Sequence, residues 1–540
     1  MLGMPIIAEA QNNVLSGDEI ISYSMANNSD GGFIFSEGRV AGFLKDKVIT
    51  DNPVTTFSNL IAQGMDVLKR RSSSDFFTYE PDPEVRYYTH DEMADWMEKR
   101  NYELFNLPTT WLHSMSDESN SYFYYSLLNI ISSLFPSISG TKWGGFILNY
   151  LIYLALLFVF YKLTGEFECS PGERMFLTLL LGTACDVISR ICLIRAYLLA
   201  MMMCTVLALM HVRLWKQVEA DKRIFMKWII PVTVLAIFSH YSNGLAIISF
   251  ALPTLILLRK NQRKKDALRY CLFTGVGILI AILLDPFSIA GLLMKFVDES
   301  SSPAGNLLND LANYYTVTLI PGTSLVLLIA VTLYNVIIRK RLISIKNFRY
   351  LQIAGYLLIS IILCTILILF GTKLARYLSI LTPSCILLIG LLGIWNCRCL
   401  RENTSSAIVN GMSILFFLLT AGLNGYHSIQ SFRENNAEAS ALRNAIAQVS
   451  DQSCILLRNR RSAYGHVPEI SQFRNCQVIT LSSENWESLV TEENLENNMI
   501  LIVCGIEKDN IPEDWLKAHH YSVLSPIYDT DGLVIVPIKR

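Results

Sequence analysis

Long apolar runs separated by short polar connections dominate the chain from Trp143 onward. A hydrocarbon core about 30 Å thick requires about 20 apolar residues per helix, so each run predicts a membrane-spanning helix. The predicted spans are residues 143–162, 174–188, 196–212, 224–239, 242–258, 269–285, 316–338, 349–370, 376–396 and 407–424. The pattern therefore predicts a polytopic α-helical membrane protein with about ten transmembrane helices.

The basic residues are sorted between the connections. Under this register one side of the membrane carries the loops 213–227, 259–269 and 339–349, with Arg398 and Arg401. Lys and Arg favour cytoplasmic loops, so this side is predicted to be cytoplasmic. The segments on the outer side are then residues 1–142, 186–195, 285–315 and everything after about 425.

Three regions follow from this register. Residues 1–142 form a first extracytoplasmic loop with amphipathic helices, including stretches at 60–68 and 93–104. Residues 143–425 form the transmembrane domain. Residues 426–540 return to a soluble composition, which predicts a small extracytoplasmic α/β domain. Its expected elements are a helix at 437–449 and strands at 454–457, 477–481, 499–504 and 532–537.

The start of the chain does not explain how the first loop is exported. The segment from Met1 to Ala10 is too short for a signal peptide or a spanning helix. The expectation is that a first transmembrane helix is missing, with Pro5 to Ala10 as its last residues.

Composition agrees with the membrane assignment and excludes several functions. Hydrophobic residues make up 52% of the 540 positions and charged residues only 17%, which is too apolar for a soluble chain of this length. A balance of 45 basic against 46 acidic residues argues against a nucleic-acid partner. No Walker loop, Rossmann glycine pattern or nucleophile elbow is present. Most of the cysteines lie in apolar spans, and Cys397 and Cys399 lack partner histidines, so no metal site is expected.

Ionisable residues near the spans gather on the outer side. They are Asp18, Glu19, Asp117, Glu118, Asp186, Arg190, Arg195, His240, Asp285, Lys373 and Arg376. Charges near a membrane are costly, so their concentration at one face indicates a site for a polar, phosphorylated ligand.

Each of these residues also has a structural interpretation. Asp186 and Arg190 are one helical turn apart and favour an ion pair. His240 fits an interface histidine, and Asp285 before Pro286 fits a helix terminus. Asp18 and Glu19 fit a helix N-terminus, and Arg195 fits a residue that extends its charge to the interface.

Short motifs such as Arg195-Ala-Tyr197 and Ser239-His-Tyr241 resemble those of bacterial GT-C glycosyltransferases of the protein O-mannosyltransferase-like group. The segment from Pro5 to Asn27, with its Asp18-Glu19 pair, resembles the start of the first outer loop in that family. Residues 120–136 resemble the later part of that loop, although relatives read His-Pro-Pro where Asn120 begins this segment. The short motifs that resemble the family are Arg195-Ala-Tyr197, Ser239-His-Tyr241, and Arg376-Tyr377 followed by Pro383.

The resemblance implies an inverting transfer from a polyprenyl-phosphate sugar, with Asp18 as general base beside Glu19. Such a reaction needs cations to hold the departing phosphate and aromatic faces to bind the sugar. The expected phosphate-binding residues are Arg195, Lys373, Arg376 and His240. The expected pocket residues are Tyr197, Tyr241, Tyr377, Glu118 and Asn120.

The resulting prediction is a membrane glycosyltransferase acting on the outer face of a bacterial inner membrane. Its partners would be a polyprenyl-phosphate sugar donor, membrane lipid and a glycan, lipid or protein acceptor. The pattern admits a divalent cation without requiring one. A lipid-linked-sugar flippase, a secondary transporter or a non-catalytic envelope sensor would share the hydropathy.

Overall fold

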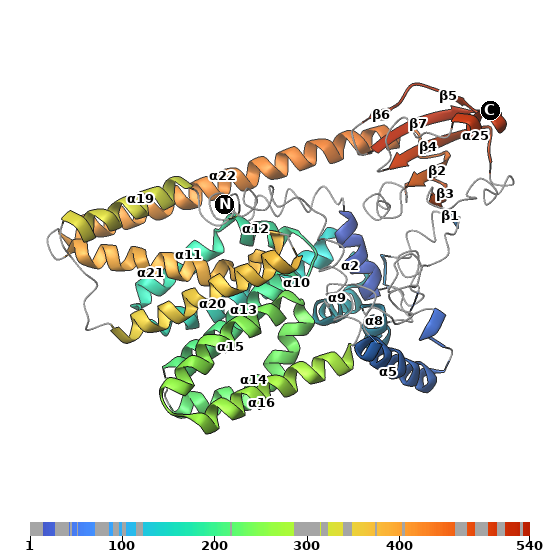
Figure 1. Ribbon diagram of the computed structural model, residues 1–540. Helices are drawn as coiled ribbons and strands as arrows, with labels where there is room; N and C mark the ends of the chain where they lie inside the picture. Colours follow the sequence, from blue (N-terminus) through green and yellow to red (C-terminus); the bar gives the residue numbers. More distant parts are fainter. Residues whose placement is uncertain are drawn as a thin grey trace.

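The computed structural model describes residues 15–27, 43, 46–50, 52–70, 86–89, 97–99, 104–114, 122–216, 219–285, 314, 322–338, 348–372, 375–401, 405–458, 472–480, 495–504, 513–529 and 533–540. These residues form a bundle of long helices with a mixed β-sheet beyond one end (Figure 1). The helices before the bundle are α2 (Gly17–Asn27), α5 (Pro53–Arg70), α8 (Leu107–Ser114), α9 (Tyr122–Leu134) and the 3₁₀ turn η3 (Pro136–Ile138). They lie at the end of the bundle that faces the sheet.

The bundle itself consists of the helices from α10 to α22. They are α10 (Lys142–Gly165), α11 (Pro171–Gly182), α12 (Cys185–Cys192), α13 (Tyr197–Trp215), α14 (Glu219–Ser239), α15 (Ser242–Lys260), α16 (Lys264–Leu284), α19 (Gly322–Leu333) with the π-helical turn η6 (Tyr334–Ile338), α20 (Phe348–Thr372), the 3₁₀ segment η8 (Ala375–Leu381), α21 (Thr382–Arg401) and α22 (Ser406–Ala447).

Six helices in the described residues are long and apolar enough to cross a membrane. They are Lys142–Gly165, Tyr197–Trp215, Ser242–Lys260, Lys264–Leu284, Leu351–Leu369 and Arg376–Leu400, and the bent pair α11–α12 adds a seventh candidate. Phe225–Ser239, Val326–Val336 and Ile414–His427 are shorter apolar helices. The protein is thus a polytopic helical membrane protein with six or seven candidate spans, and helix occupies part of each of the ten predicted ranges.

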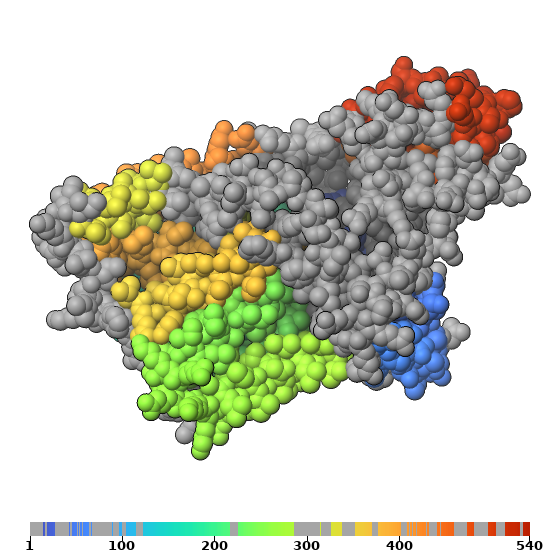
Figure 2. Space-filling model, in the orientation of Figure 1, coloured from blue at the N-terminus to red at the C-terminus, as the bar shows by residue number. Residues whose placement is uncertain are grey.

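Helix α16 shows how the spans present apolar surface to their surroundings. Leu268, Leu272, Leu279 and Leu283 follow one helical stripe and are 71%, 57%, 53% and 55% exposed. A continuous exposed apolar stripe is unfavourable in water and favourable against lipid chains. In Figure 2 this helix, in light green, forms part of a broad face of the bundle.

The predicted span 174–188 is broken between α11 and α12, and the helix axis bends by 55° at the break. Ser170 and Glu173 form a capping box that starts α11, with Pro171 at its first position. At the other end, the hydroxyl of Tyr153 donates a hydrogen bond of 3.2 Å to the carbonyl of Gly182. This bond satisfies a carbonyl that the helix break would otherwise leave unpaired.

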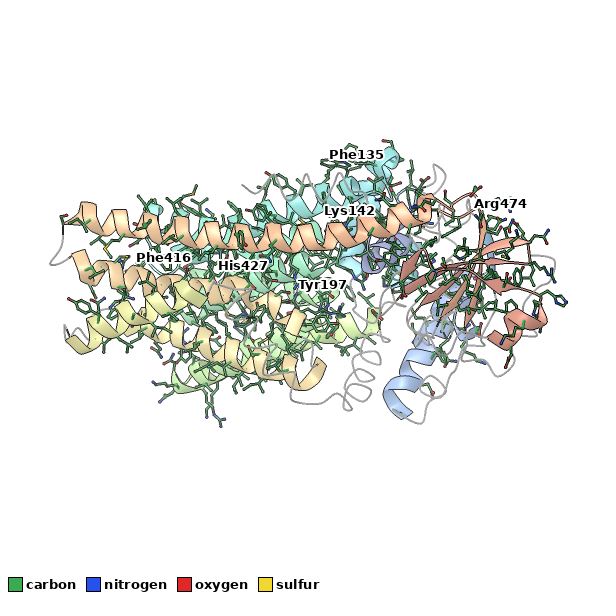
Figure 3. All side chains as sticks on the ribbon, turned by 90° about the horizontal axis from the view of Figure 1, so that it is seen from above. Phe135, Lys142, Tyr197, Phe416, His427 and Arg474 are labelled. Carbon is green, nitrogen blue, oxygen red and sulfur yellow. The ribbon has the colours of Figure 1, made fainter. Side chains whose placement is uncertain are left out.

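Helix α22 joins two segments that the sequence predicted as separate, the span 407–424 and the helix 437–449. It runs for 42 residues without a break, which corresponds to about 63 Å. Residues 426–447 contain neither Gly nor Pro, so nothing in them interrupts the helix. Figures 1 and 3 show that α22 connects the bundle to the sheet.

The sheet has the strand order β1-β3-β2-β4-β7-β5, and β6 also pairs with β7. The strands are β1 (Arg86–Thr89), β2 (Ser453–Arg458), β3 (Asn475–Thr480), β4 (Asn498–Cys504), β5 (Ser522–Val523), β6 (Tyr528–Asp529) and β7 (Leu533–Lys539). Strands β3, β2 and β4 are parallel, whereas β1 and β7 add to them antiparallel. The four predicted strands are confirmed as β2, β3, β4 and β7, with ends that differ by at most two residues.

The parallel strands are apolar on both faces because both faces are covered. Cys454 and Leu456 pack in one cluster with Leu442 and Ile446 near the end of α22. Ile455 and Leu457 pack in a second cluster with Trp515 of α25 (Glu513–Ala518). Alternating residues of one strand thus enter two cores, as expected for a buried parallel strand.

Strand β1 comes from the first loop and was not predicted. Arg86 to Thr89 pair with Val478 to Asn475 of β3, so residues of the segment 1–142 complete the sheet formed by 426–540. The two predicted regions therefore share one sheet at this edge.

Ion pairs tie the ends of α10 and α13 together at the opposite end of the bundle. Glu166 accepts hydrogen bonds from Arg213 Nε and Lys216 Nζ, both at 2.8 Å. Burial alone would raise the pKa of the Glu166 carboxyl. The hydrogen bonds from Lys216 and Arg213 outweigh burial and lower this pKa below its usual value of 4.5.

A carboxyl with a lowered folded-state pKa stabilises the protein above its unfolded pKa, and that contribution is lost as the pH falls through the folded value. We expect Glu166→Gln to lower the melting temperature of the detergent-purified protein at neutral pH. At about pH 3 the two proteins should melt much closer together. A difference that is equal at both pH values would contradict this assignment.

Candidate functional site

Four buried rings meet at the end of the bundle that faces the sheet. They are Tyr197 at the start of α13, His240 and Tyr241 between α14 and α15, and Tyr377 in η8, and none is more than 6% exposed. The His240 ring centroid lies 4.6 Å from that of Tyr241, 5.1 Å from that of Tyr377 and 5.5 Å from that of Tyr197. Three separate sequence motifs therefore form one aromatic cluster.

Hydrogen bonds fix the orientation of His240 within this cluster. Its Nδ1 accepts from the backbone N–H of Ser242 at 3.2 Å and lies 2.7 Å from the Ser242 hydroxyl. A neutral imidazole that accepts at Nδ1 carries its proton on Nε2. Asn243, which follows, donates to the Ala200 carbonyl at 3.2 Å and to Ser239 Oγ at 2.8 Å, so it ties this connection to α13.

Two arginines lie against the rings of the aromatic cluster. The guanidinium of Arg190 is 5.1 Å from the Tyr197 ring centroid, and that of Arg376 is 5.3 Å from the Tyr377 ring centroid. Arg190 is also paired with the buried Asp186 at 3.1 Å, which confirms the predicted i, i+4 ion pair. Arg376, in contrast, is exposed.

Asp186 connects the broken span to the site. Its second oxygen accepts a hydrogen bond of 2.6 Å from the hydroxyl of Thr382, the first residue of α21. Because η8 with Tyr377 directly precedes α21, this bond helps to hold α12 against the aromatic cluster.

Arg195 stands two residues before Tyr197 and is half-buried. Its Nη1 donates a hydrogen bond of 2.6 Å to the hydroxyl of Tyr125 in α9. The first-loop segment that carries Tyr125 therefore contacts the beginning of α13.

Glu19 of α2 is fully buried and pairs with Lys142, the first residue of α10. Lys142 Nζ lies 2.8 Å from Oε1 and 2.6 Å from Oε2. The backbone N–H groups of Ile194 and Ser16 donate to the same carboxylate at 3.1 Å and 2.7 Å. Both oxygens thus already accept hydrogen bonds, which favours an anchoring role for Glu19 over proton transfer.

A second set of contacts docks α2 onto α10. The hydroxyl of Tyr23 accepts a hydrogen bond of 2.7 Å from the Gly145 N–H and donates to the Thr141 carbonyl. A Cβ on Gly144 would lie 2.8 Å from this hydroxyl, and one on Gly145 would lie 2.4 Å from Ile194. The Gly144-Gly145 pair therefore allows α2, α10 and the segment before Arg195 to approach closely.

The hydrogen bond from Ile194 to Glu19 brings the Asp18-Glu19 pair close to the Arg195-Ala-Tyr197 motif. Ile194, whose N–H bonds to Glu19, directly precedes Arg195. The first turn of α2, which includes the backbone of Asp18, thus lies next to the segment that begins α13. Figure 3 shows Lys142 and Tyr197 in the half of the bundle nearer the sheet.

The remaining predicted residues lie outside the aromatic cluster or outside the described residues. The side chain of Asp18 lies outside the described residues, as do Glu118, Asn120 and Lys373. Asp285 is the buried C-cap of α16, which confirms the predicted helix terminus. No group of three potential metal-ligating side chains occurs among the residues that the structure describes.

The arrangement combines groups that suit a phosphorylated sugar lipid. Aromatic faces stack on sugars and on cations, and arginine side chains bind phosphate oxygens bidentately. Neither Lys142, the last residue of the predicted first loop, nor Tyr125 was predicted as a site residue. A lysine at the start of an apolar run usually extends to the interface, so only the fold reveals its buried partner.

No protein-family model and no curated protein matches this chain. Its structure is similar to the crystal structure of ArnT from Cupriavidus metallidurans bound to undecaprenyl phosphate, with 12% identity and a TM-score of 0.44, over 78% of this chain and 88% of that chain. The structure of the same protein in the apo state matches with 12% identity and a TM-score of 0.44, over 81% of this chain and 92% of that one.

Proposed function

We propose that this protein is a membrane glycosyltransferase that moves a sugar from a polyprenyl-phosphate carrier to a cell-envelope acceptor. The observation that carries the proposal is the aromatic cluster of Tyr197, His240, Tyr241 and Tyr377 at one end of the spans. Arg376 lies against the Tyr377 ring, and Arg195 stands two residues before Tyr197. Charged groups retained at a membrane mark functional sites, and these lie where a lipid-borne phosphate can reach them.

The reaction requires a base, a phosphate clamp and a sugar platform. Asp18 takes the proton of the acceptor hydroxyl as its oxygen attacks the anomeric carbon. The bond from that carbon to the phosphate oxygen breaks, and polyprenyl phosphate leaves with the electron pair. A single displacement inverts the anomeric centre through an oxocarbenium-like transition state.

The clamp is assigned to Arg195, Arg376, Lys373 and His240. Positive charge and N–H donors stabilise the negative charge that develops on the departing phosphate. Tyr197, Tyr241 and Tyr377 would provide the walls for the sugar and the first isoprene units, together with Glu118 and Asn120. A divalent cation beside the phosphate is compatible with this chemistry and is not needed by it.

The proposed location is a bacterial inner membrane, with the site on the extracytoplasmic face. The Lys and Arg asymmetry supports a cytoplasmic position for the connection between α15 and α16, and the site lies at the other end of these helices. The three shorter apolar helices would then complete about ten spans, and α22 would carry the sheet outside.

The direct test is a reconstituted assay in proteoliposomes. Purified protein is mixed with a panel of polyprenyl-phosphate sugars and envelope extracts, and release of polyprenyl phosphate is followed together with sugar on the acceptor. We expect transfer with at least one donor. Movement of the sugar lipid across the bilayer without transfer would overturn the proposal and favour a transporter.

Replacing Arg376 tests the phosphate clamp in particular. A hydrogen bond to a charged group contributes about 1.5 to 3 kcal/mol, so Arg376→Ala should weaken binding of polyprenyl phosphate roughly tenfold to a hundredfold. Binding can be measured by titrating the lipid against intrinsic tryptophan fluorescence. Arg269→Ala is the matched control because Arg269 is also exposed but lies near the start of α16, outside the aromatic cluster. Equal losses in both variants would contradict the clamp.

A further inference from the structure

A cavity lies at the end of the bundle opposite the aromatic cluster. It has a volume of about 280 Å³ and is lined by side chains from the ends of α13, α15 and α20. The residues that give it its chemical character are Trp215, Lys216, Lys260, Asn261, Gln352 and Tyr356. The cavity thus combines two ammonium groups, two amides and two aromatic rings with polar edges.

Its position follows from the length of α13. This helix begins at Tyr197 in the aromatic cluster and ends at Trp215 in the cavity. Eighteen residues of helical rise correspond to about 27 Å, close to the hydrocarbon thickness of about 30 Å. The cavity therefore lies at the second membrane interface, where Trp and Tyr side chains concentrate.

The charge around the cavity is positive. Glu166 neutralises part of the charge of Arg213 and Lys216, with which it pairs at 2.8 Å. Arg259 and Lys260 at the end of α15 are exposed and add two further positive charges. Within the part of the chain that the structure describes, Lys260 forms no ion pair.

The cavity is built on fixed elements. Trp215 Nε1 donates to Thr254 Oγ1 at 2.9 Å, and its ring centroid lies 5.7 Å from that of Tyr356. Gln352 donates to the Tyr356 hydroxyl at 2.7 Å.

The turn at the end of α15 fixes the rim of the cavity. Arg263 N–H bonds to the Leu258 carbonyl at 2.9 Å, and Gln262 N–H bonds to the Arg259 carbonyl at 3.0 Å. With Gln262 at a φ of 57°, these bonds form a Schellman motif. This motif holds Lys260 and Asn261 in place beside the cavity.

We propose that this cavity binds the phosphate headgroup of an anionic phospholipid from the leaflet at the basic end of the bundle. Basic pockets between transmembrane helices attract such headgroups, and the amides and the Tyr356 hydroxyl can hydrogen-bond phosphate oxygens. The volume is at the lower limit for small-molecule sites, which suits a headgroup better than a sugar lipid. The site lies about one membrane thickness from the aromatic cluster, so it is separate from the proposed donor site.

The test measures lipid binding to the purified full chain by native mass spectrometry in detergent. The probes are phosphatidylglycerol, phosphatidylcholine and water-soluble glycerol 3-phosphate. Phosphatidylglycerol should bind more tightly than phosphatidylcholine. Reversing one charge at the site, in Lys260→Glu, should weaken phosphatidylglycerol binding roughly tenfold or more. The matched control is Lys265→Glu, because Lys265 is exposed in the first turn of α16 and does not line the cavity.

Loss of phosphatidylglycerol in Lys260→Glu with retention in Lys265→Glu supports the site. Equal losses in the two variants would overturn it, because they would reflect general attraction of anionic lipid to a basic face. Glycerol 3-phosphate that displaces the lipid at equal concentration would also overturn it, because the ligand would then be a free phosphate. A second variant, Gln352→Leu, removes an amide without changing charge and should weaken phosphatidylglycerol but leave phosphatidylcholine unchanged.

Discussion

Lys142→Met is expected to lower the free energy of unfolding by about 3 to 5 kcal/mol, the usual cost of removing one partner from a buried ion pair. The side chains of Lys142 and Glu19 are 4% and 0% exposed, so methionine would leave a buried carboxylate without its cation. The backbone N–H groups of Ser16 and Ile194 would remain as its hydrogen-bond donors, which is insufficient for a full negative charge. Denaturant titration of the protein in detergent measures the difference.

The double variant Glu19→Gln with Lys142→Met is the control. Its neutral amide leaves no unpaired charge, and the amide oxygen can still accept from Ser16 or from Ile194, so most of the lost stability should return. A double variant as unstable as Lys142→Met alone would show that methionine fails to fit at position 142, and it would sink the ion-pair explanation.

The helices could be predicted because each span is a local property of the sequence. Apolar runs such as Ser242–Lys260 depend only on neighbouring residues, and the structure contains helix in every predicted range. The same reasoning identified strands β2, β3, β4 and β7 from short apolar runs. The break between α11 and α12 was not predicted, and Tyr153, which hydrogen-bonds the Gly182 carbonyl at the break, comes from another helix.

Long-range pairings could not be predicted from one sequence. Lys142 and Glu19 are 123 positions apart, and β1 pairs with a strand almost 400 residues away. Residues Arg86 to Thr89 form a short segment with no pattern that distinguishes them from loop, and their partner β3 alone makes them a strand. The continuity of α22 was missed for a different reason, because its polar residues after Gly425 look like the start of a separate region.

The aromatic cluster could be predicted in part, because its residues were identified from the sequence but their contacts were not. Tyr197, Tyr241 and Tyr377 were named from separate motifs, and only the packing of α13, α15 and η8 brings their rings within 6.1 Å of each other or of His240. Residue type therefore indicated the chemistry, whereas the fold supplied the geometry. The same is true of Arg195, whose contact with Tyr125 joins two motifs that are 70 positions apart.

Asp18→Asn should reduce sugar transfer by roughly a hundredfold or more while stability and donor binding stay close to those of the native protein. Asparagine preserves the shape of the side chain and its hydrogen-bonding capacity but cannot accept the acceptor's proton. Asp18 stands in the first turn of α2, and this helix is fixed by Glu19 and Tyr23, so the substitution leaves those anchors in place. The measurement is turnover of polyprenyl-phosphate sugar in proteoliposomes, with polyprenyl-phosphate binding and melting temperature recorded for the same preparation.

Glu19→Gln provides the contrast, because both oxygens of the Glu19 carboxylate already accept hydrogen bonds from Lys142. That variant should lose stability, and any activity it retains should keep the pH dependence of the native protein. Asp18→Asn should instead retain stability and lose the acidic limb of the pH–rate profile, since a general base must be deprotonated to act. Unchanged turnover in Asp18→Asn would exclude Asp18 as the base and direct attention to Glu118.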